Sequence, residues 1–61
     1  MNMLRHFKYD HLPAHLQEVS KPFADLAHLV AHSLPADPET STCLRKLLEA
    51  KDCAVRAAVS I

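Results

Sequence analysis

The chain has 61 residues, 49% of them hydrophobic, and its seven Lys and Arg balance seven Asp and Glu. A neutral chain lacks the strongly basic surface that sequence-independent binding of DNA or RNA requires. Folded chains of this size bury only about 60% of their unfolded surface, so they usually need a disulfide, a metal or further subunits for stability. Length and composition therefore exclude a large core and argue against a nucleic-acid-binding domain.

Residues 1–12 lack a clear hydrophobic period and predict an extended or irregular arm. Residues 13–34 predict the first helix, because Pro13 suits a first helical turn and apolar residues recur every three or four positions. This apolar stripe consists of Leu16, Val19, Phe23, Leu26, Val30 and Leu34. A polar stripe, with Glu18, Lys21, Asp25, His28 and His32, lies opposite. Pro22 lies inside the helix and predicts either a kink just before it or a fresh start with Ser20 as N-cap.

Residues 38–60 predict the second helix, with Asp37 as its N-cap and Pro38 in its first turn. Its apolar residues follow two neighbouring faces instead of one. One face contains Leu44, Leu47, Leu48, Val55 and Ala58, and the other contains Cys43, Leu47, Ala50, Ala54, Ala57 and Ile61. Only one of these faces can pack within a two-helix hairpin. What covers the other face is open at this point.

The two cysteines, Cys43 and Cys53, lie ten residues apart on this helix, about 15 Å along its axis. A disulfide needs Cα atoms within about 7 Å, so we expect reduced thiols, buried on the apolar faces, as is typical of a reducing compartment. The sequence shows no signal peptide and no apolar run of membrane-spanning length. We therefore expect a cytoplasmic protein with no membrane partner.

Two histidine pairs have the four-residue spacing of a helical metal site: His11 with His15, and His28 with His32. Neither pair has a carboxylate or thiolate at a third position of recognised spacing. We expect no metal site and no cofactor. Cysteines on buried faces make poor nucleophiles, and no serine-based pattern is supported. We therefore expect that the protein is not an enzyme.

The cations of the second helix are interspersed with Glu49 and Asp52. They are Arg45, Lys46, Lys51 and Arg56. A salt-bridged, solvent-exposed surface explains this pattern. A helix-turn-helix repressor normally needs a third helix and a basic recognition face, so we expect no DNA binding.

Three segments in order carry a resemblance to a known family. They are Phe7-Lys8-Tyr9, then FADLAHLVAHSLP, then E-T-S-x-x-L-x-K-L-x-E-A followed by A-x-x-A-A. The combination resembles the small helical-hairpin family of phage anti-CBASS and anti-Thoeris proteins, the sponges that sequester cyclic nucleotide alarm signals. The resemblance runs from Phe7 to about Val59 without gaps in the helices or the turn.

The resemblance implies one all-α domain over residues 1–61, an antiparallel helical hairpin that packs into a homo-oligomer, often a hexamer. The face with Leu44 would pack within the hairpin, and the face with Cys43 would meet another subunit. It also implies a non-catalytic sponge, in the cytoplasm of the infected bacterial host, that binds cyclic dinucleotides or trinucleotides without cleaving them. The alternative is a dimeric hairpin that docks on a partner protein and has no small-molecule ligand.

Binding such a ligand needs an aromatic ring to stack on a base, and cations or helix N-termini for phosphates. The residues that the resemblance and this chemistry indicate are Phe7, Lys8, Tyr9, Thr40, Ser41, Arg45 and Lys46. Tyr9 has two open roles, stacking on a base or anchoring the arm, and Phe7 suits anchoring better. Arg5 is also placed to reach phosphate from the arm. The hydroxyls of residues 40–42 either cap the second helix or bind a cyclic trinucleotide.

Three positions depart from the family pattern. Pro38 stands where relatives often carry an arginine, Cys53 where a larger aromatic residue is common, and Pro22 where an ordinary helix former is expected. The first departure weakens the case for a trinucleotide site, and the second affects packing between subunits. These departures bear on ligand choice more than on fold.

Overall fold

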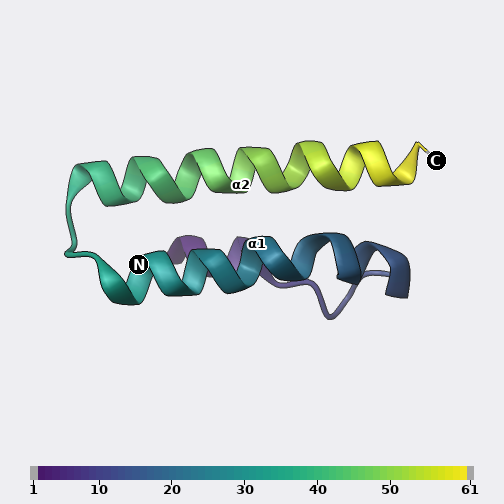
Figure 1. Cartoon of the computed structure of the whole chain (residues 1–61), viewed down its shortest axis with the longest axis horizontal. Coiled ribbons are helices and arrows are strands. Elements are labelled where there is room, and N and C mark those ends of the chain that lie inside the picture. The colour runs from purple at the N-terminus through teal and green to yellow at the C-terminus, as the bar shows by residue number, and fades with distance from the viewer. Residues whose placement is uncertain (1, 61) are drawn as a thin grey trace.

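The computed structural model describes residues 2–60 and consists of two long helices that form an antiparallel hairpin (Figure 1). Helix α1 (Ala14–Ser33) and helix α2 (Pro38–Val59) are joined by a turn at residues 34–37, and a short 3-10 helix, η1 (Asn2–Phe7), precedes them. No strand occurs within residues 2–60. The predicted all-α hairpin is therefore confirmed for a single chain.

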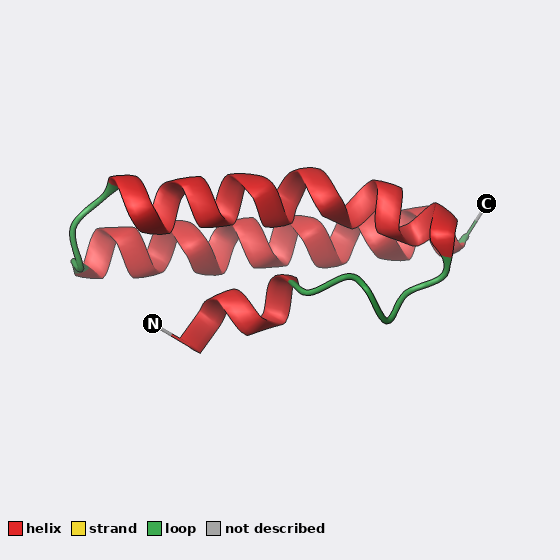
Figure 2. Cartoon of the chain, turned by 90° about the horizontal axis from the view of Figure 1, so that it is seen from below, coloured by secondary structure: helices red, strands yellow, loops and turns green. Residues whose placement is uncertain are grey.

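The N-terminal arm is more regular than the sequence predicts, because residues 2–7 form η1. Figures 1 and 2 show the arm lying along the hairpin and running toward the end of the molecule where α1 begins. Phe7 is only 1% exposed and holds the arm against the hairpin by packing with Ala24, Ala27 and Leu44 in the core. The prediction of an irregular arm is therefore wrong for residues 2–7 and holds for residues 8–12, which form a loop with turns. A 3-10 helix as short as η1 has no 3.6-residue hydrophobic period to detect.

Helix α1 runs without a break through Pro22, so the predicted fresh start at Ser20 is wrong. A bend within the continuous helix stays a prediction. Ser20 is itself a buried residue inside the helix, and its Oγ has no hydrogen-bond partner among residues 2–60. Ser20 is buried because the face of α1 that packs on the rest of the chain is not the predicted apolar stripe.

The buried stripe of α1 is rotated from the predicted one. The buried residues are Leu16, Ser20, Ala24 and Ala27. By contrast, Leu26 and Leu34 of the predicted stripe are 46% and 48% exposed. Small side chains occupy the contact line because they let η1 and α2 approach the α1 backbone closely, while Phe23 and Val30 pack at its edges. The polar stripe of α1 is exposed, as predicted.

Helix α2 begins as the sequence predicts. The Oδ1 atom of Asp37 accepts a hydrogen bond from the Glu39 N–H at 2.8 Å, and Pro38 is the first helical residue. Leu44 is fully buried, and Leu47 and Leu48 pack against the core. This confirms that the first apolar face of α2 packs inside the hairpin.

The second apolar face of α2 is largely uncovered within residues 2–60, since Cys43, Ala50 and Ala57 are exposed. Leu47, which both faces share, packs against the core, Ala54 is half-buried, and Ile61 lies outside the described residues. Cys53 is also exposed, and both cysteines are free within the described residues. The prediction of buried thiols is therefore wrong for the single chain. A hairpin partner covers only one side of a helix, and α1 lies on the Leu44 side.

The molecule is a rod of 37 × 17 × 15 Å, a shape that leaves little interior. Among residues 2–60, its buried apolar residues are Phe7, Leu16, Ala24, Ala27 and Leu44. Leu29 and Val59, in contrast, are 62% and 64% exposed. A core of this size is marginal for a chain of 61 residues. Among the described residues, no helix combines the length and apolarity needed to cross a bilayer.

Candidate ligand-binding site

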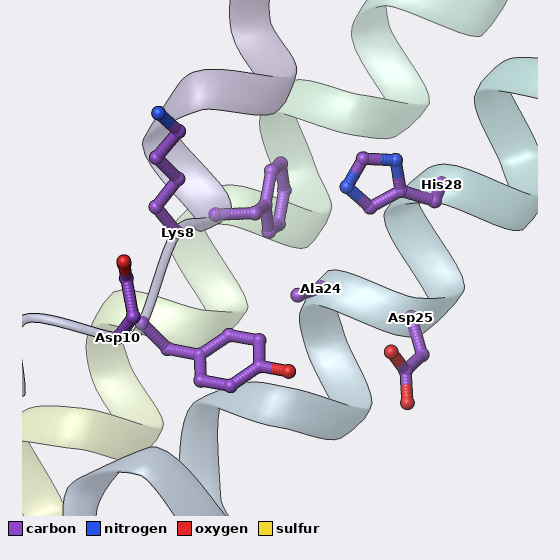
Figure 3. A pocket seen from close by; sticks show the side chains of 7 residues that line it. Lys8, Asp10, Ala24, Asp25 and His28 are labelled. Atoms are coloured by element: carbon purple, nitrogen blue, oxygen red, sulfur yellow. The ribbon is translucent and has the colours of Figure 1, made fainter.

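An open cavity of about 440 Å³ lies between the arm and α1. We call it the Tyr9 cavity; its lining residues are Phe7, Lys8, Tyr9, Asp10, Ala24, Asp25 and His28. Figure 3 shows that Lys8 and Asp10 come from the arm, and that Ala24, Asp25 and His28 come from α1. The predicted Phe7-Lys8-Tyr9 segment thus forms one wall of a cavity, although the burial of Phe7 gives it the anchoring role.

The backbone around Tyr9 is held by a hydrogen bond within the arm and by a second bond from α1. The Leu12 N–H donates to the Tyr9 carbonyl at 3.0 Å, and Gln17 Nε2 donates to the Leu12 carbonyl at 2.7 Å. Tyr9 itself is half-buried and packs against the core cluster. Its ring therefore anchors the arm, and its remaining exposed part is available to a ligand in the cavity.

Charges of both signs surround the Tyr9 cavity. Lys21 Nζ lies 2.6 Å from Asp25 Oδ2, and Asp25 is one of the lining residues. The pKa of Lys21 is raised, first by the hydrogen bond to Asp25, then by the Asp25 charge and by the Tyr9 phenol. Lys21 therefore lies beside the cavity, and its positive charge is paired with the carboxylate of Asp25.

Two histidines of α1, His28 and His32, interact with each other, and His28 lines the Tyr9 cavity. The His28 and His32 rings are stacked, with centroids 6.1 Å apart and planes at 13°. The Nδ1 atom of His32 lies 2.7 Å from the His28 carbonyl oxygen, a hydrogen bond within the helix. No group of three or more His, Cys, Asp and Glu side chains suited to a metal ion occurs in the described part of the chain.

A second cavity of about 370 Å³ lies between the arm and α2. We call it the cationic groove, because four of the seven Lys and Arg residues line it: Arg5, Lys8, Lys51 and Arg56. His6 and His11 also line it, and Asp52 is its one acidic lining residue within the described chain. With neutral histidines, four cations and one carboxylate give the groove a formal charge of +3 in a protein of zero net charge.

Most of this positive charge is not neutralised by carboxylates. Residues 2–60 form two ion pairs, Lys21 with Asp25 and Lys51 with Asp52, and the Lys51 Nζ to Asp52 Oδ1 distance is 3.1 Å. Arg56 donates from Nη2 to the Cys53 Sγ atom at 3.4 Å. The predicted salt-bridged surface of α2 is therefore wrong for Arg45, Lys46 and Arg56, and holds for Lys51.

The remaining predicted site residues lie elsewhere. Thr40 is 7% exposed and lines a mainly apolar cavity of about 170 Å³ at the hairpin turn. The Ser41 N–H donates to the Asp37 carbonyl at 3.0 Å, as the backbone of a first helical turn does. Arg45 and Lys46 are exposed and line none of these three cavities. The structure therefore does not bring Thr40, Ser41, Arg45 or Lys46 together with Tyr9.

The cationic groove contains residues that sequence reasoning assigned to other roles. The sequence predicts a salt-bridged surface for Lys51 and Arg56 and a histidine pair for His11, yet these three residues line one groove. The sequence signal was incomplete: Lys51 and Arg56 lie on either side of Val55 around α2, and Arg5 precedes Lys8 by one 3-10 turn, but nothing local joins the two segments. Comparison of the chain with protein-family models, curated proteins and solved structures gives no match.

Proposed function

We propose that this protein is a non-catalytic sponge, which binds a cyclic dinucleotide immune signal in the Tyr9 cavity and sequesters it from bacterial anti-phage defence. The observation that carries the proposal is the half-buried Tyr9 ring, held beside Lys8 at the wall of a cavity of about 440 Å³. Cavities for small molecules typically have volumes of about 300–1,000 Å³. The Tyr9 cavity falls within this range.

The chemistry of the cavity matches the two parts of a cyclic dinucleotide. An aromatic ring that stacks on a base contributes about 1–3 kcal/mol, and Tyr9 offers such a ring from a fixed backbone. Lys8 is exposed and has no carboxylate partner among residues 2–60, so its ammonium is available for a phosphate. The arm thus supplies one stacking group, Tyr9, and one cation, Lys8, from adjacent residues.

We further propose that the working form is a homo-oligomer, for which the resemblance gives a hexamer. Two features of the single chain support this assembly. The second face of α2 is largely uncovered within residues 2–60, and the large apolar residues Leu26, Leu29, Leu34 and Val59 are exposed. Sequestration depends on tight binding of the ligand and on many copies of the protein, and it needs no catalytic turnover. A second subunit laid over the open Tyr9 cavity would remove the ligand from solvent.

The experiment is native mass spectrometry of the purified protein, alone and with a panel of cyclic dinucleotides and trinucleotides. We expect an oligomer that takes up a fixed number of ligands and releases them chemically unchanged on denaturation. Tyr9→Leu keeps apolar packing but removes the flat ring, so it should lose ligand while still assembling. Tyr9→Phe keeps the ring and is the matched control, which should retain most of the binding.

Two results would contradict the proposal. A dimer that ignores every member of the panel would favour the alternative, a hairpin that docks on a partner protein. Conversion of the ligand into a product would show catalysis and exclude a sponge. Equal binding by Tyr9→Leu and the unmodified protein would remove the Tyr9 cavity as the binding site.

A further inference from the structure

We infer that the cationic groove is a second, separate anion site, and that it binds the di- or triphosphate group of a small molecule. This goes beyond the proposed function, which concerns the Tyr9 cavity on the other side of the arm. Lys8 lines both cavities, so the arm forms the ridge between them. The inference rests on the composition of the groove, on its geometry and on the pairing of its charges.

The charge of the groove fits a polyphosphate better than a phosphodiester. A phosphodiester carries one negative charge per phosphate, whereas a phosphomonoester carries about −1.5 to −2 at pH 7, and a di- or triphosphate carries more. Four cations and one carboxylate within a groove of about 370 Å³ match such a concentrated charge. The Tyr9 cavity, with Asp10 and Asp25 in its wall, does not offer the same excess of positive charge.

The side chains that line the groove favour recognition of phosphates over recognition of a base. Its described lining contains no Phe, Tyr or Trp, and its apolar members are Leu12 and Val55. Arg5 comes from η1 and Arg56 comes from α2, so guanidinium groups from two elements line one space. Guanidinium groups bind phosphate oxygens through paired N–H donors, which favours adjacent phosphates.

The side-chain environments leave these donors available. Arg5 and Arg56 have no carboxylate partner among residues 2–60, and the Arg56 guanidinium donates to a thiol, a weak acceptor. The Lys51 side chain is 14% exposed, so its charge acts in a partly desolvated setting, where attraction to an anion is stronger than in water. Asp52, its neighbour, is 46% exposed and offsets only one of the four cations.

The test is isothermal titration calorimetry with inorganic pyrophosphate and tripolyphosphate, compared with orthophosphate at constant ionic strength. We expect pyrophosphate and tripolyphosphate to bind at least about tenfold more tightly than orthophosphate, as added charge-assisted contacts require. Arg56→Gln should weaken pyrophosphate binding by about tenfold or more. Arg45→Gln is the matched control, because Arg45 is an exposed arginine of the same helix outside the groove, and it should change binding by less than about twofold.

Absence of pyrophosphate binding by the folded protein would overturn the inference. So would an equal loss in Arg45→Gln and Arg56→Gln, because that pattern indicates non-specific attraction to charge. Helical content, measured by circular dichroism, checks that both variants fold. Arg56→Gln should bind cyclic dinucleotides as the unmodified protein does, and Tyr9→Leu should still bind pyrophosphate. The two proposed sites can therefore be tested, and rejected, independently of each other.

Discussion

Lys21 Nζ donates to Asp25 Oδ2 at 2.6 Å, one turn further along the exposed side of α1 and beside the Tyr9 cavity. Both side chains are mostly exposed, so their attraction is screened by water and adds little to stability. The raised pKa of Lys21 means that the contribution of the pair is complete below the usual lysine pKa and is lost only as pH rises through the raised value. At neutral pH, Lys21 is therefore charged, and we expect the pair to matter more for a bound ligand than for the fold.

Asp25→Asn should tighten the binding of a cyclic dinucleotide several-fold. The substitution removes a negative charge from the cavity wall and releases Lys21 to interact with phosphate. Calorimetric titration measures the change, and the thermal midpoint should stay constant. Glu18→Gln, an exposed residue of the same helix outside the cavity lining, is the control and should have no effect. Weaker binding by Asp25→Asn would show instead that the carboxylate accepts a hydrogen bond from the ligand.

Phe7→Ala should cost about 3–5 kcal/mol of unfolding free energy, as truncation of a buried phenylalanine does. Phe7 is 1% exposed and ties the arm to both helices through Ala24, Ala27 and Leu44. The loss is a large fraction of the roughly 5–15 kcal/mol that holds a small domain together. Urea denaturation followed by circular dichroism measures it.

Leu29→Ala is the matched control for Phe7→Ala, measured under dilute conditions where the chain is monomeric. Leu29 is 62% exposed, so truncation there should cost much less than at Phe7. If Phe7→Ala and Leu29→Ala unfold at the same urea concentration, the arm does not dock on the hairpin in solution. The binding of a ligand to Tyr9 would then lack its fixed backbone.

Ser20→Ala should stabilise the protein by about 1 kcal/mol. The Ser20 side chain is 1% exposed, and its hydroxyl has no hydrogen-bond partner in the described chain, so folding removes it from water without compensation. Alanine keeps the small contact surface between α1 and its neighbours and is the better helix former. A higher thermal midpoint checks this. Ser33→Ala, at the exposed end of α1, should change the midpoint far less.

The hairpin could be predicted because its signals are local. Pro13, Asp37 and Pro38 mark helix starts, and Leu44 with its neighbours marks the packed face of α2. The rotation of α1 could not be predicted from hydrophobicity, since the larger residues Leu26 and Leu34 make a stronger apolar stripe than the alanines that are buried. Small residues are buried on α1 because they allow η1 and α2 to approach its backbone closely.

The candidate site was predictable in part, for the same reason. The pattern Phe7-Lys8-Tyr9 pointed to the arm, and the structure places these residues on one cavity. The cationic groove needs Arg5 and Lys8 to meet Lys51 and Arg56, which are more than forty residues away along the chain. That meeting depends on the docking of the arm through Phe7, and no local pattern contains it.

The two thiols give a test of the proposed assembly. In the single chain, both Cys43 and Cys53 are exposed. Cys43 shares its side of α2 with Ala50 and Ala57, at intervals of seven residues, whereas Cys53 lies about 80° around the helix from Cys43. If a second subunit covers the Cys43 side, the two thiols should react at different rates with a thiol reagent under native conditions.

We expect Cys53 to react rapidly and Cys43 at least about tenfold more slowly, because the assembly must open before a covered thiol meets the reagent. Cys43→Ser and Cys53→Ser assign the two phases, and denaturant should make the remaining thiol of each variant equally reactive. Dilution below the assembly concentration should also accelerate the slow phase, since dissociation uncovers the face. Equal native rates at all concentrations would exclude the Cys43 side from the interface and leave the exposed leucines of α1 as the surface that joins the subunits.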